Sequence, residues 1–301
     1  MNRFRDKRWE DIFLDTFIYL SLIFLIIVTL YPFLNTLAVS FNDAVDSSRG
    51  GIHLWPRKFT LYNYETLLTR TQIYRASMVS VARTVLSTAL CTFSTAMVAY
   101  TISRREFVLR RIISFIYVLT MYIDGGLVPT YFLIRALGLT NNFWVYVLPG
   151  LVSAFNLIVI RTYISGLPDS FIESARIDGA GEFTIFLRII LPLCKPVLAT
   201  IALFVAVDNW NAWFDTFLYN SANPALSTLQ YELMKVLQSA NTMSGSLLQA
   251  LSRAAAGTSN TVTPRAIRAT MTVIVSVPII IVYPFLQKYF VHGLTLGGIK
   301  E

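Results

Sequence analysis

Long apolar runs are the feature that most constrains what this chain can fold into. They cover about residues 12–41, 73–102, 112–139, 142–164, 189–208 and 264–290, and 55% of the 301 residues are hydrophobic. Lipid accepts only helices or closed barrels, because no water is present to satisfy backbone N–H and C=O groups. Barrel strands alternate in hydropathy over segments of about ten residues, which this sequence does not do. The sequence therefore predicts an all-α, polytopic membrane protein with six transmembrane helices, since a span needs roughly 20 apolar residues.

Basic residues set the predicted orientation of these helices. The densest clusters lie at residues 3–8 and 104–111, and basic residues concentrate on the cytoplasmic side of membrane proteins. Both termini are therefore expected in the cytoplasm, as residues 1–11 and 291–301, and residues 209–263 are expected to form an external loop. The formal net charge of +8 is explained by this topology, so no nucleic-acid partner is expected.

Residues typical of catalysis are sparse. His53 and His292 are the only histidines, and Cys91 and Cys194 lie inside or beside apolar runs, so neither a metal site nor a disulfide framework is expected. A membrane-embedded enzyme would need clustered catalytic groups, and a secondary transporter would show paired repeats or charged relays. Both remain alternatives, and dependence on a nucleotide would separate them from an ATP-driven transporter.

A charged loop, residues 165–190, separates the fourth and fifth apolar runs. Ser170 and Glu173 form an S-x-x-E pattern that predicts a helix N-terminus with a capping box. Gly179 suits the left-handed position that ends a helix, and a second helix is expected to begin near Glu182. The charged loop therefore predicts a helix, a glycine turn and another helix, exposed to the cytoplasm as a docking element.

The same residues carry a family resemblance. Glu173-Ser174-Ala175, Gly179 and Ile189-x-Leu191-Pro192 resemble the EAA loop of permease subunits in bacterial binding-protein-dependent ABC importers, and only Ser174 departs from that pattern. Residues 210–214 (WNAWF) and 293–300 (GLTLGGIK) resemble segments of maltose-type carbohydrate permeases. Residues 126–131 and 228–233 resemble the branch that includes the lipoprotein-associated, alginate and rhamnogalacturonan-oligosaccharide importers.

The resemblance implies a single permease domain over residues 1–301, in the bacterial plasma (inner) membrane. It implies a heterodimer with a homologous permease, two ATPase subunits and a solute-binding protein outside the cytoplasm, either periplasmic or lipid-anchored. The substrate would be an oligosaccharide or polysaccharide, with an acidic, alginate-like sugar as the first expectation. The chain has no G-x-x-x-x-G-K-[ST] motif, so it is expected to be no enzyme and to hold no cofactor, with ATP and Mg bound by the ATPase subunits.

Two groups of site residues follow from the resemblance. The EAA helix would enter a cleft of the ATPase, and the alternative is that the loop is merely ordered. The expected ATPase-docking residues are Glu173, Ser174, Ala175, Asp178, Gly179, Ala180, Gly181 and Phe183. The expected substrate-path residues are Arg83, Tyr122, Asp124, Asp208, Asn209, Trp210, Asn211 and Trp213.

Intramembrane charges are functional hypotheses by default, because charges are costly in lipid. Arg83 is interpreted either as a contact for a uronate carboxylate or as half of an internal Arg–Asp pair, and Asp215 is expected to be interfacial. The tryptophans are interpreted as a sugar platform or an aromatic belt. Asp124, Gly125, Gly126 and Pro129 predict a break in the third run that lines a cavity or protein. In the external loop, a helix is expected over 226–237, and the loop either receives the binding protein or only covers the bundle.

Overall fold

A computed structural model describes residues 9–242 and 262–295. In these ranges every regular element is a helix, and one isolated β-bridge joins Asn42 and Phe59, which confirms the all-α prediction. The chain divides into two compact units, Met1–Arg70 with Lys235–Ser276 and Thr71–Met234 with Val277–Glu301. Most of the two expected cytoplasmic ends (residues 1–11 and 291–301), and residues 243–261 of the expected external loop, lie outside the described residues.

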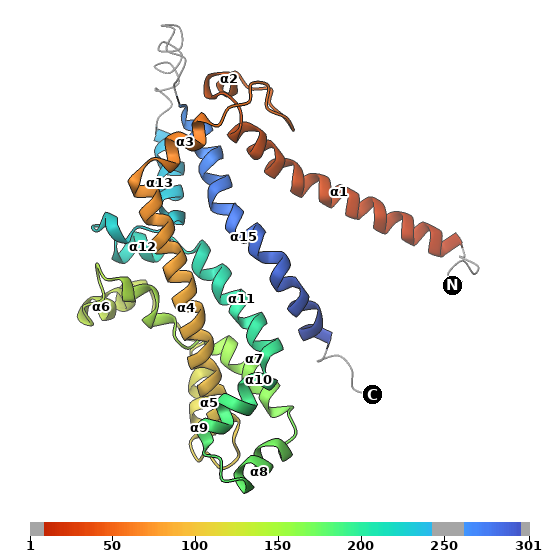
Figure 1. Cartoon of the computed structure of the whole chain (residues 1–301), viewed down its shortest axis with the longest axis vertical. Helices are drawn as coiled ribbons and strands as arrows, with labels where there is room; N and C mark the ends of the chain where they lie inside the picture. The colour runs from red at the N-terminus through yellow and green to blue at the C-terminus, as the bar shows by residue number, and fades with distance from the viewer. Residues whose placement is uncertain (1–8, 243–261, 296–301) are drawn as a thin grey trace. The chain divides into compact units, whose positions relative to one another are not determined.

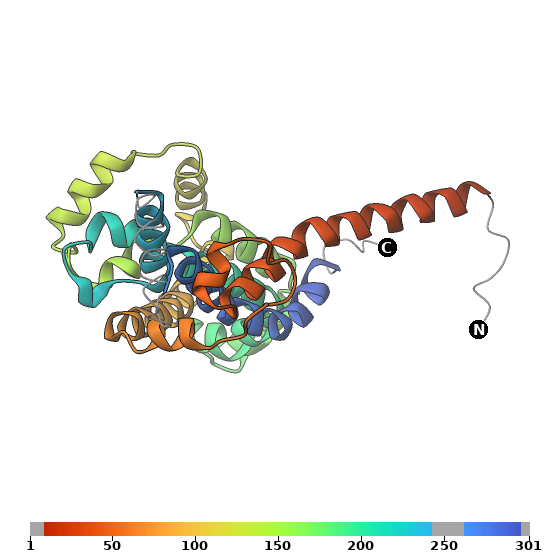
Figure 2. The ribbon, with the colours of Figure 1, turned by 90° about the horizontal axis from the view of Figure 1, so that it is seen from above.

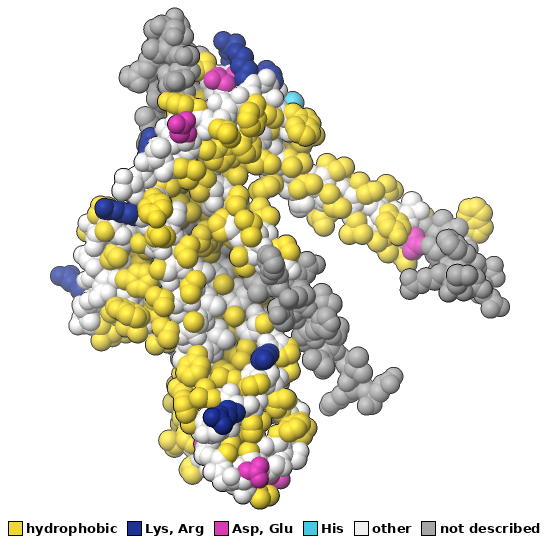
Figure 3. Space-filling model, viewed as in Figure 1, with side chains coloured by type: hydrophobic (Ala, Val, Ile, Leu, Met, Phe, Trp, Pro, Cys, Tyr) yellow, Lys and Arg dark blue, Asp and Glu magenta, His cyan; other side chains and the backbone are white. Residues whose placement is uncertain are grey.

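The first unit is dominated by α1 (Trp9–Ser40), an unbroken helix (Figures 1 and 2). Between Phe13 and Val28 its large apolar side chains are exposed, and they cover its visible face (Figure 3). A helix that is apolar on all sides is suited to lipid or to another membrane helix. Its last turn is different, because Ala38 and Val39 are buried in a cluster with Ile52 and Ala269.

A polar network closes the segment after α1. Two short helices, α2 (Ala44–Ser48) and α3 (Tyr62–Leu68), frame it. The fully buried Asn42 side chain donates to Asp46 Oδ2 at 3.0 Å and accepts from the Lys58 amide at 2.8 Å. Arg57 Nε lies 3.1 Å from the same carboxylate oxygen. The hydrogen bond from Asn42, followed by the charge of Arg57, lowers the pKa of Asp46, so the carboxylate stays ionised in this segment.

The second unit is built on α4 (Thr71–Ser103), which packs against α7 (Ala154–Ser165) and α11 (Lys195–Asn211). Its core includes Leu157, Ile160, Ile185 and Ile201, each with no exposed surface. The remaining helices are α5 (Arg110–Leu119), α6 (Leu127–Ala136), α8 (Ser170–Ile177), α9 (Glu182–Ile185), α10 (Leu191–Leu193), α12 (Phe214–Tyr219) and α13 (Leu229–Thr242). Short turns are η1 (Phe143–Tyr146), η2 (Leu148–Gly150), the π-helical η3 (Phe186–Ile190) and η4 (Pro224–Leu226).

Several apolar runs are broken helices. The predicted interruption of the third run is confirmed, because α5 and α6 are separated by residues 120–126. The fourth and fifth runs are bent as well. The fourth bends by 47° between η1–η2 and α7, and the fifth bends by 82° at Cys194, between Pro192 and Pro196. Proline cannot donate the helix hydrogen bond and its ring crowds the preceding turn, which accounts for these breaks.

The last run forms α15 (Pro264–Thr295), which contains Pro278 and Pro284. Three helices, α1, α4 and α15, are long and apolar enough to cross a membrane within the described ranges, and counting each bent pair as one span gives five. The helix expected over 226–237 in the external loop is α13, which starts at Leu229 and continues to Thr242. The two interpretations of this loop, as a receiver of the binding protein or as a cover of the bundle, also involve residues 243–261, which lie outside the described residues.

Polar side chains on α4 satisfy the irregular backbone of these broken segments. Each of three buried hydroxyls bonds a main-chain group far away in sequence: Ser80 Oγ accepts from the Leu229 amide at 2.8 Å, Ser87 Oγ donates to the Tyr146 carbonyl at 3.1 Å, and Thr95 Oγ1 donates to the Leu151 carbonyl at 3.3 Å. A buried backbone group without a partner costs about 1–3 kcal/mol. Helix α4 thus supplies the hydrogen bonds that these main-chain groups in η1, after η2 and at the start of α13 lack.

The substitution Ser80→Ala should destabilise the protein by about 1–3 kcal/mol, because it leaves the buried Leu229 amide without its acceptor. The matched control is Ser77→Ala, one turn earlier, whose hydroxyl bonds only the Ile73 carbonyl of its own helix. Thermal unfolding of the purified protein in detergent measures both variants. Equal midpoints for the two would contradict this role of Ser80.

Candidate functional site

The charged loop forms α8 and α9 with a glycine turn between them. Gly179 has φ +80°, which is the left-handed conformation that favours glycine. The Ala180 amide donates to the Ala175 carbonyl at 2.9 Å, and the Gly179 amide donates to the Arg176 carbonyl at 3.0 Å. This pair of bonds is a Schellman motif, which ends α8 and fixes the direction of the chain into α9. The predicted helix–glycine–helix arrangement is confirmed.

The predicted capping box is wrong. Helix α8 begins at Ser170, so Asp169 is the N-cap residue, and no side chain bonds the first turn there. Asp169 instead lies 3.6 Å from Arg104, measured between Oδ1 and Nη1. The Glu173 side chain therefore has no capping role, and its carboxylate makes no hydrogen bond or ion pair within the part of the chain that the structure describes. Its carboxylate is available to a partner.

The charged loop has an inward and an outward face. Ile172, Ala175 and Ile185 are buried in the core of the second unit, and Ala180 is half-buried against it. The other expected docking residues are exposed: Glu173, Ser174, Asp178, Gly179, Gly181 and Phe183, the last at 61%. Ala175 thus packs inward, and its small side chain lets α8 lie close to the core of the second unit. The acidic residues and Phe183 face outward.

An ion-pair network holds this loop to the end of α4. Arg176 lies 3.0 Å from Glu106 and 2.8 Å from Glu182, and Tyr100 of α4 donates to Glu182 at 2.6 Å. Hydrogen bonds to Glu106 and then Glu182 raise the pKa of Arg176. Two hydrogen bonds lower the pKa of Glu106: the first and larger contribution comes from its own backbone amide, and the second comes from Arg176. This network could not be predicted from the sequence, because Glu106 lies 70 residues from Arg176 and no local pattern joins them.

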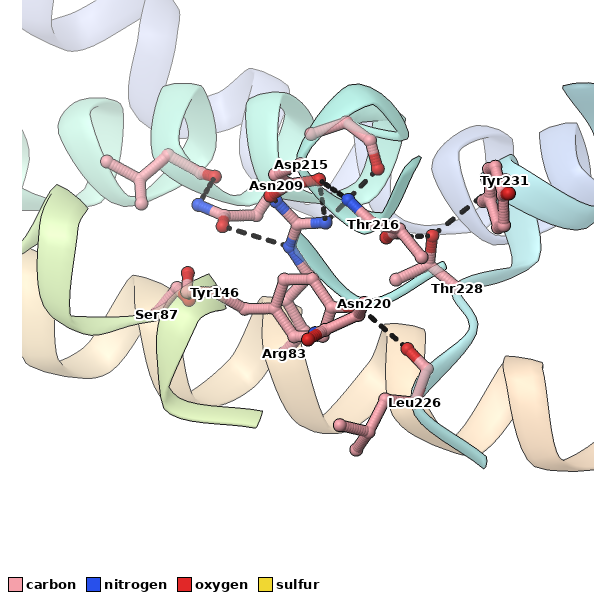
Figure 4. Close-up of polar contacts among 12 residues, drawn as sticks. Arg83, Ser87, Tyr146, Asn209, Asp215, Thr216, Asn220, Leu226, Thr228 and Tyr231 are labelled. Carbon is pink, nitrogen blue, oxygen red and sulfur yellow. Dashed lines mark hydrogen bonds and ion pairs between the residues drawn. The ribbon is translucent and has the colours of Figure 1, made fainter. Parts of the chain in front are cut away.

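A second polar cluster surrounds Arg83 on α4 (Figure 4). Arg83 is 3% exposed, and its guanidinium forms an ion pair with the carboxylate of Asp215 on α12. The second arm of this fork is Nη1 to Oδ1 at 3.1 Å. Nη1 also donates to the Ala212 carbonyl at 3.1 Å, and Nε donates to Asn209 Oδ1 at 3.4 Å. Of the two interpretations of Arg83, the geometry matches the internal Arg–Asp pair.

Aromatic and hydroxyl groups complete the cluster. The Arg83 guanidinium lies 4.7 Å from the ring centre of Tyr146, whose hydroxyl donates to the Leu226 carbonyl at 2.7 Å. Thr216 and Thr228 share a hydrogen bond of 3.0 Å in the same region. Asp215 is thus not simply interfacial, as expected from sequence; it is the counter-ion of Arg83, with a side chain 26% exposed. A bidentate, hydrogen-bonded partner is what makes a buried guanidinium tolerable.

The other expected path residues are placed differently. Tyr122 is 82% exposed, and Asp124 accepts from the Gly126 amide at 3.2 Å in the break between α5 and α6. Neither takes part in the contacts around Arg83. Asp208 and Asn211 are exposed on the last turns of α11, and Trp213 packs edge-to-face on Phe214 with ring centres 5.7 Å apart.

Trp210 lies in an apolar environment. It is 9% exposed and lines a cavity of about 230 Å³ between α4, α11 and the second unit's part of α15. The other lining residues are Val81, Thr84, Val85, Leu203, Ala206, Val207, Pro278, Ile279 and Val282. A sugar needs hydrogen-bonding groups beside an aromatic ring, and this cavity offers almost none. Among the described residues, no group of three or more His, Cys, Asp or Glu side chains is placed to hold a metal ion.

Known proteins resemble the chain over nearly its whole length. Residues 7–296 match the family described as "Binding-protein-dependent transport system inner membrane component". The polygalacturonan/rhamnogalacturonan transport system permease protein YtcP of Bacillus subtilis is 33% identical over 95% of this chain and 98% of that protein. The protein LplC of Bacillus subtilis is 36% identical over 91% of this chain and 90% of that protein.

A solved structure agrees with these matches. A chain of a bacterial ABC transporter involved in the import of the acidic polysaccharide alginate superposes with a TM-score of 0.85 at 27% identity, covering 95% of this chain and 99% of that one. The family resemblance carried by the charged loop is therefore confirmed, and with it the location in the inner membrane. The chain belongs to the family of inner membrane components of binding-protein-dependent transport systems.

Proposed function

We propose that this chain is one permease subunit of an ABC importer for an acidic oligosaccharide or polysaccharide. Its partners are a homologous permease, two ATPase subunits and an extracytoplasmic binding protein. The charged loop carries the argument, because it offers an exposed surface of Glu173, Ser174, Asp178 and Phe183 on an ordered frame. An exposed helix face on an ordered frame suits a groove on a partner subunit. ATP and Mg belong to the ATPase subunits, and this chain is the non-catalytic membrane part.

The acidic substrate class rests on the relatives. YtcP is named for polygalacturonan and rhamnogalacturonan, and the structural neighbour imports an acidic polysaccharide. Polygalacturonan, rhamnogalacturonan and alginate all carry uronate carboxylates. In this chain Arg83 is already neutralised by Asp215, so we assign it a positioning role beside the path rather than a contact with sugar. Asn211, exposed at the end of α11, is better placed for a contact with substrate, whereas the exposed carboxylate of Asp208 would repel a uronate.

The proposed topology has six spans with both termini in the cytoplasm. Three long helices and two bent pairs account for five crossings, and α5 with α6 supplies the sixth. The charged loop then faces the cytoplasm, and residues 209–263 face outward, where they receive the binding protein. The expected domain boundaries follow from this arrangement.

Single cysteines test this topology directly. With Cys91 and Cys194 replaced and the ATPase subunits not expressed, Ser221→Cys should react with a membrane-impermeant maleimide in intact cells, whereas Asp178→Cys should react only after the membrane is opened. Both positions are exposed in the folded chain. Labelling of Asp178→Cys in intact cells would contradict the proposed orientation.

The substitution Glu173→Lys should reduce sugar-stimulated ATP hydrolysis by the reconstituted importer about tenfold or more, because reversing a charge at a docking contact costs several kcal/mol. A uronate oligosaccharide should stimulate the unaltered importer, loaded through its binding protein, more than a neutral one of equal length. ATPase activity in proteoliposomes measures both effects.

The matched control is Glu65→Lys, the same charge reversal at an exposed position of α3, which should leave stimulation unchanged. Full stimulation of the Glu173→Lys importer would show that the charged loop does not dock as proposed. A stronger response to the neutral sugar would overturn the acidic substrate class alone.

A further inference from the structure

A polar pocket lies in the second unit, where α4 and α7 end and α5 begins, and α8 forms one of its walls. Its volume is about 320 Å³, which is room for a phosphate group with its hydration or ester substituents. Five arginines line it against three carboxylates. They are Arg104, Arg105, Arg110, Arg161 and Arg176. We propose that this arginine pocket binds a phosphate-bearing anion, and that the phosphate belongs to the headgroup of an anionic lipid.

The ion pairs show which arginines are committed. Arg104 is paired with Asp169 at 3.6 Å, and Arg176 with Glu106 at 3.0 Å, so these two mainly shape the wall. Arg104 is also held by the ring of Tyr100, whose centre lies 5.3 Å from its guanidinium. Arg104 and Arg176 thus pair with two of the three carboxylates that line the pocket, and Glu173 is the one lining carboxylate that neither of them pairs with.

Three arginines remain without a carboxylate partner within the described ranges: Arg105, Arg110 and Arg161. Arg161 donates to the Ser114 hydroxyl at 3.0 Å, a neutral acceptor that leaves its charge uncompensated. Against Glu173 alone, these three give the pocket an excess of two positive charges. Guanidinium groups present N–H donors in a fork that matches phosphate oxygens, so the excess selects a phosphate rather than a neutral polar ligand.

The surface next to the pocket favours a lipid as the source. Helix α5 begins at Arg110, and its next turns expose Ile112, Phe115 and Ile116 at 58%, 66% and 51%. In an inner membrane protein such side chains face acyl chains, and a basic group beside them lies at the level of lipid headgroups. Anionic headgroups are attracted to such sites with about 1 kcal/mol per basic residue. A lipid satisfies both the apolar flank and the arginines, whereas free phosphate satisfies only the arginines.

Native mass spectrometry of the assembled importer, titrated with phosphatidylglycerol, tests the proposal. The variant Arg105→Gln/Arg110→Gln should bind this lipid about tenfold to thirtyfold more weakly than the unaltered importer. The matched control is Arg111→Gln, which removes one charge from an exposed neighbour that does not line the pocket. It should bind as the unaltered importer does. Since Arg105 is exposed, Arg105→Gln alone provides a variant without a folding defect, with an expected loss of about fivefold.

Two further arms identify the source of the phosphate. Phosphatidylcholine should not compete for the site, and inorganic phosphate should compete weakly through the same arginines. Binding of inorganic phosphate without retention of phosphatidylglycerol would overturn the lipid assignment. Equal losses in Arg111→Gln and in the double variant would overturn the pocket itself, since they would show a general charge effect. Lipid binding is measured without nucleotide, so the result is independent of the coupling proposed for the charged loop.

Discussion

A buried guanidinium on a membrane helix is the constraint on which the second unit depends. Arg83 is 3% exposed, and an unpaired charge in that position would cost several kcal/mol. The protein meets this cost with Asp215, the Ala212 carbonyl and Asn209, and with the ring of Tyr146. These partners come from the end of α11, from α12 and from η1, which are all short or broken elements. The arginine thus holds the irregular segments to the one continuous helix.

The other polar contacts of α4 also join irregular segments to this helix. Ser80, Ser87 and Thr95 bond main-chain groups that no helix satisfies, and at the far end Tyr100 bonds Glu182 of the charged loop. From Arg83 to Tyr100 the helix rises about 25 Å. Exposed ion pairs such as Arg176–Glu106 contribute little individually and are screened by salt, so the buried contacts of α4 dominate. Under the proposed function, α4 is the rigid element that joins the docking surface to the path.

Local chemistry made part of this structure predictable. The Gly179 turn, the break around Asp124 and the long helix α4 follow from glycine, proline and apolar periodicity, and the structure contains all three. The bends near residue 150 and at Cys194 lie beside Pro149, Pro192 and Pro196, and they were not predicted. Asp215 could not be assigned to Arg83 from sequence, because 132 residues separate them. The capping box failed for a local reason, since α8 starts one residue too early for Ser170 to cap it.

A double-mutant cycle on Arg83 and Asp215 tests the central claim most directly. Arg83→Ala and Asp215→Ala should each reduce the unfolding free energy, by about 3–5 kcal/mol when one buried charge is left alone, and the double variant should lose well under their sum. The parallel cycle with Arg75→Ala, an exposed arginine on the same helix, should be additive within about 0.5 kcal/mol. Unfolding in mixed micelles measures both cycles. Additive losses for Arg83 and Asp215 would show that their ion pair does not hold the broken segments to α4.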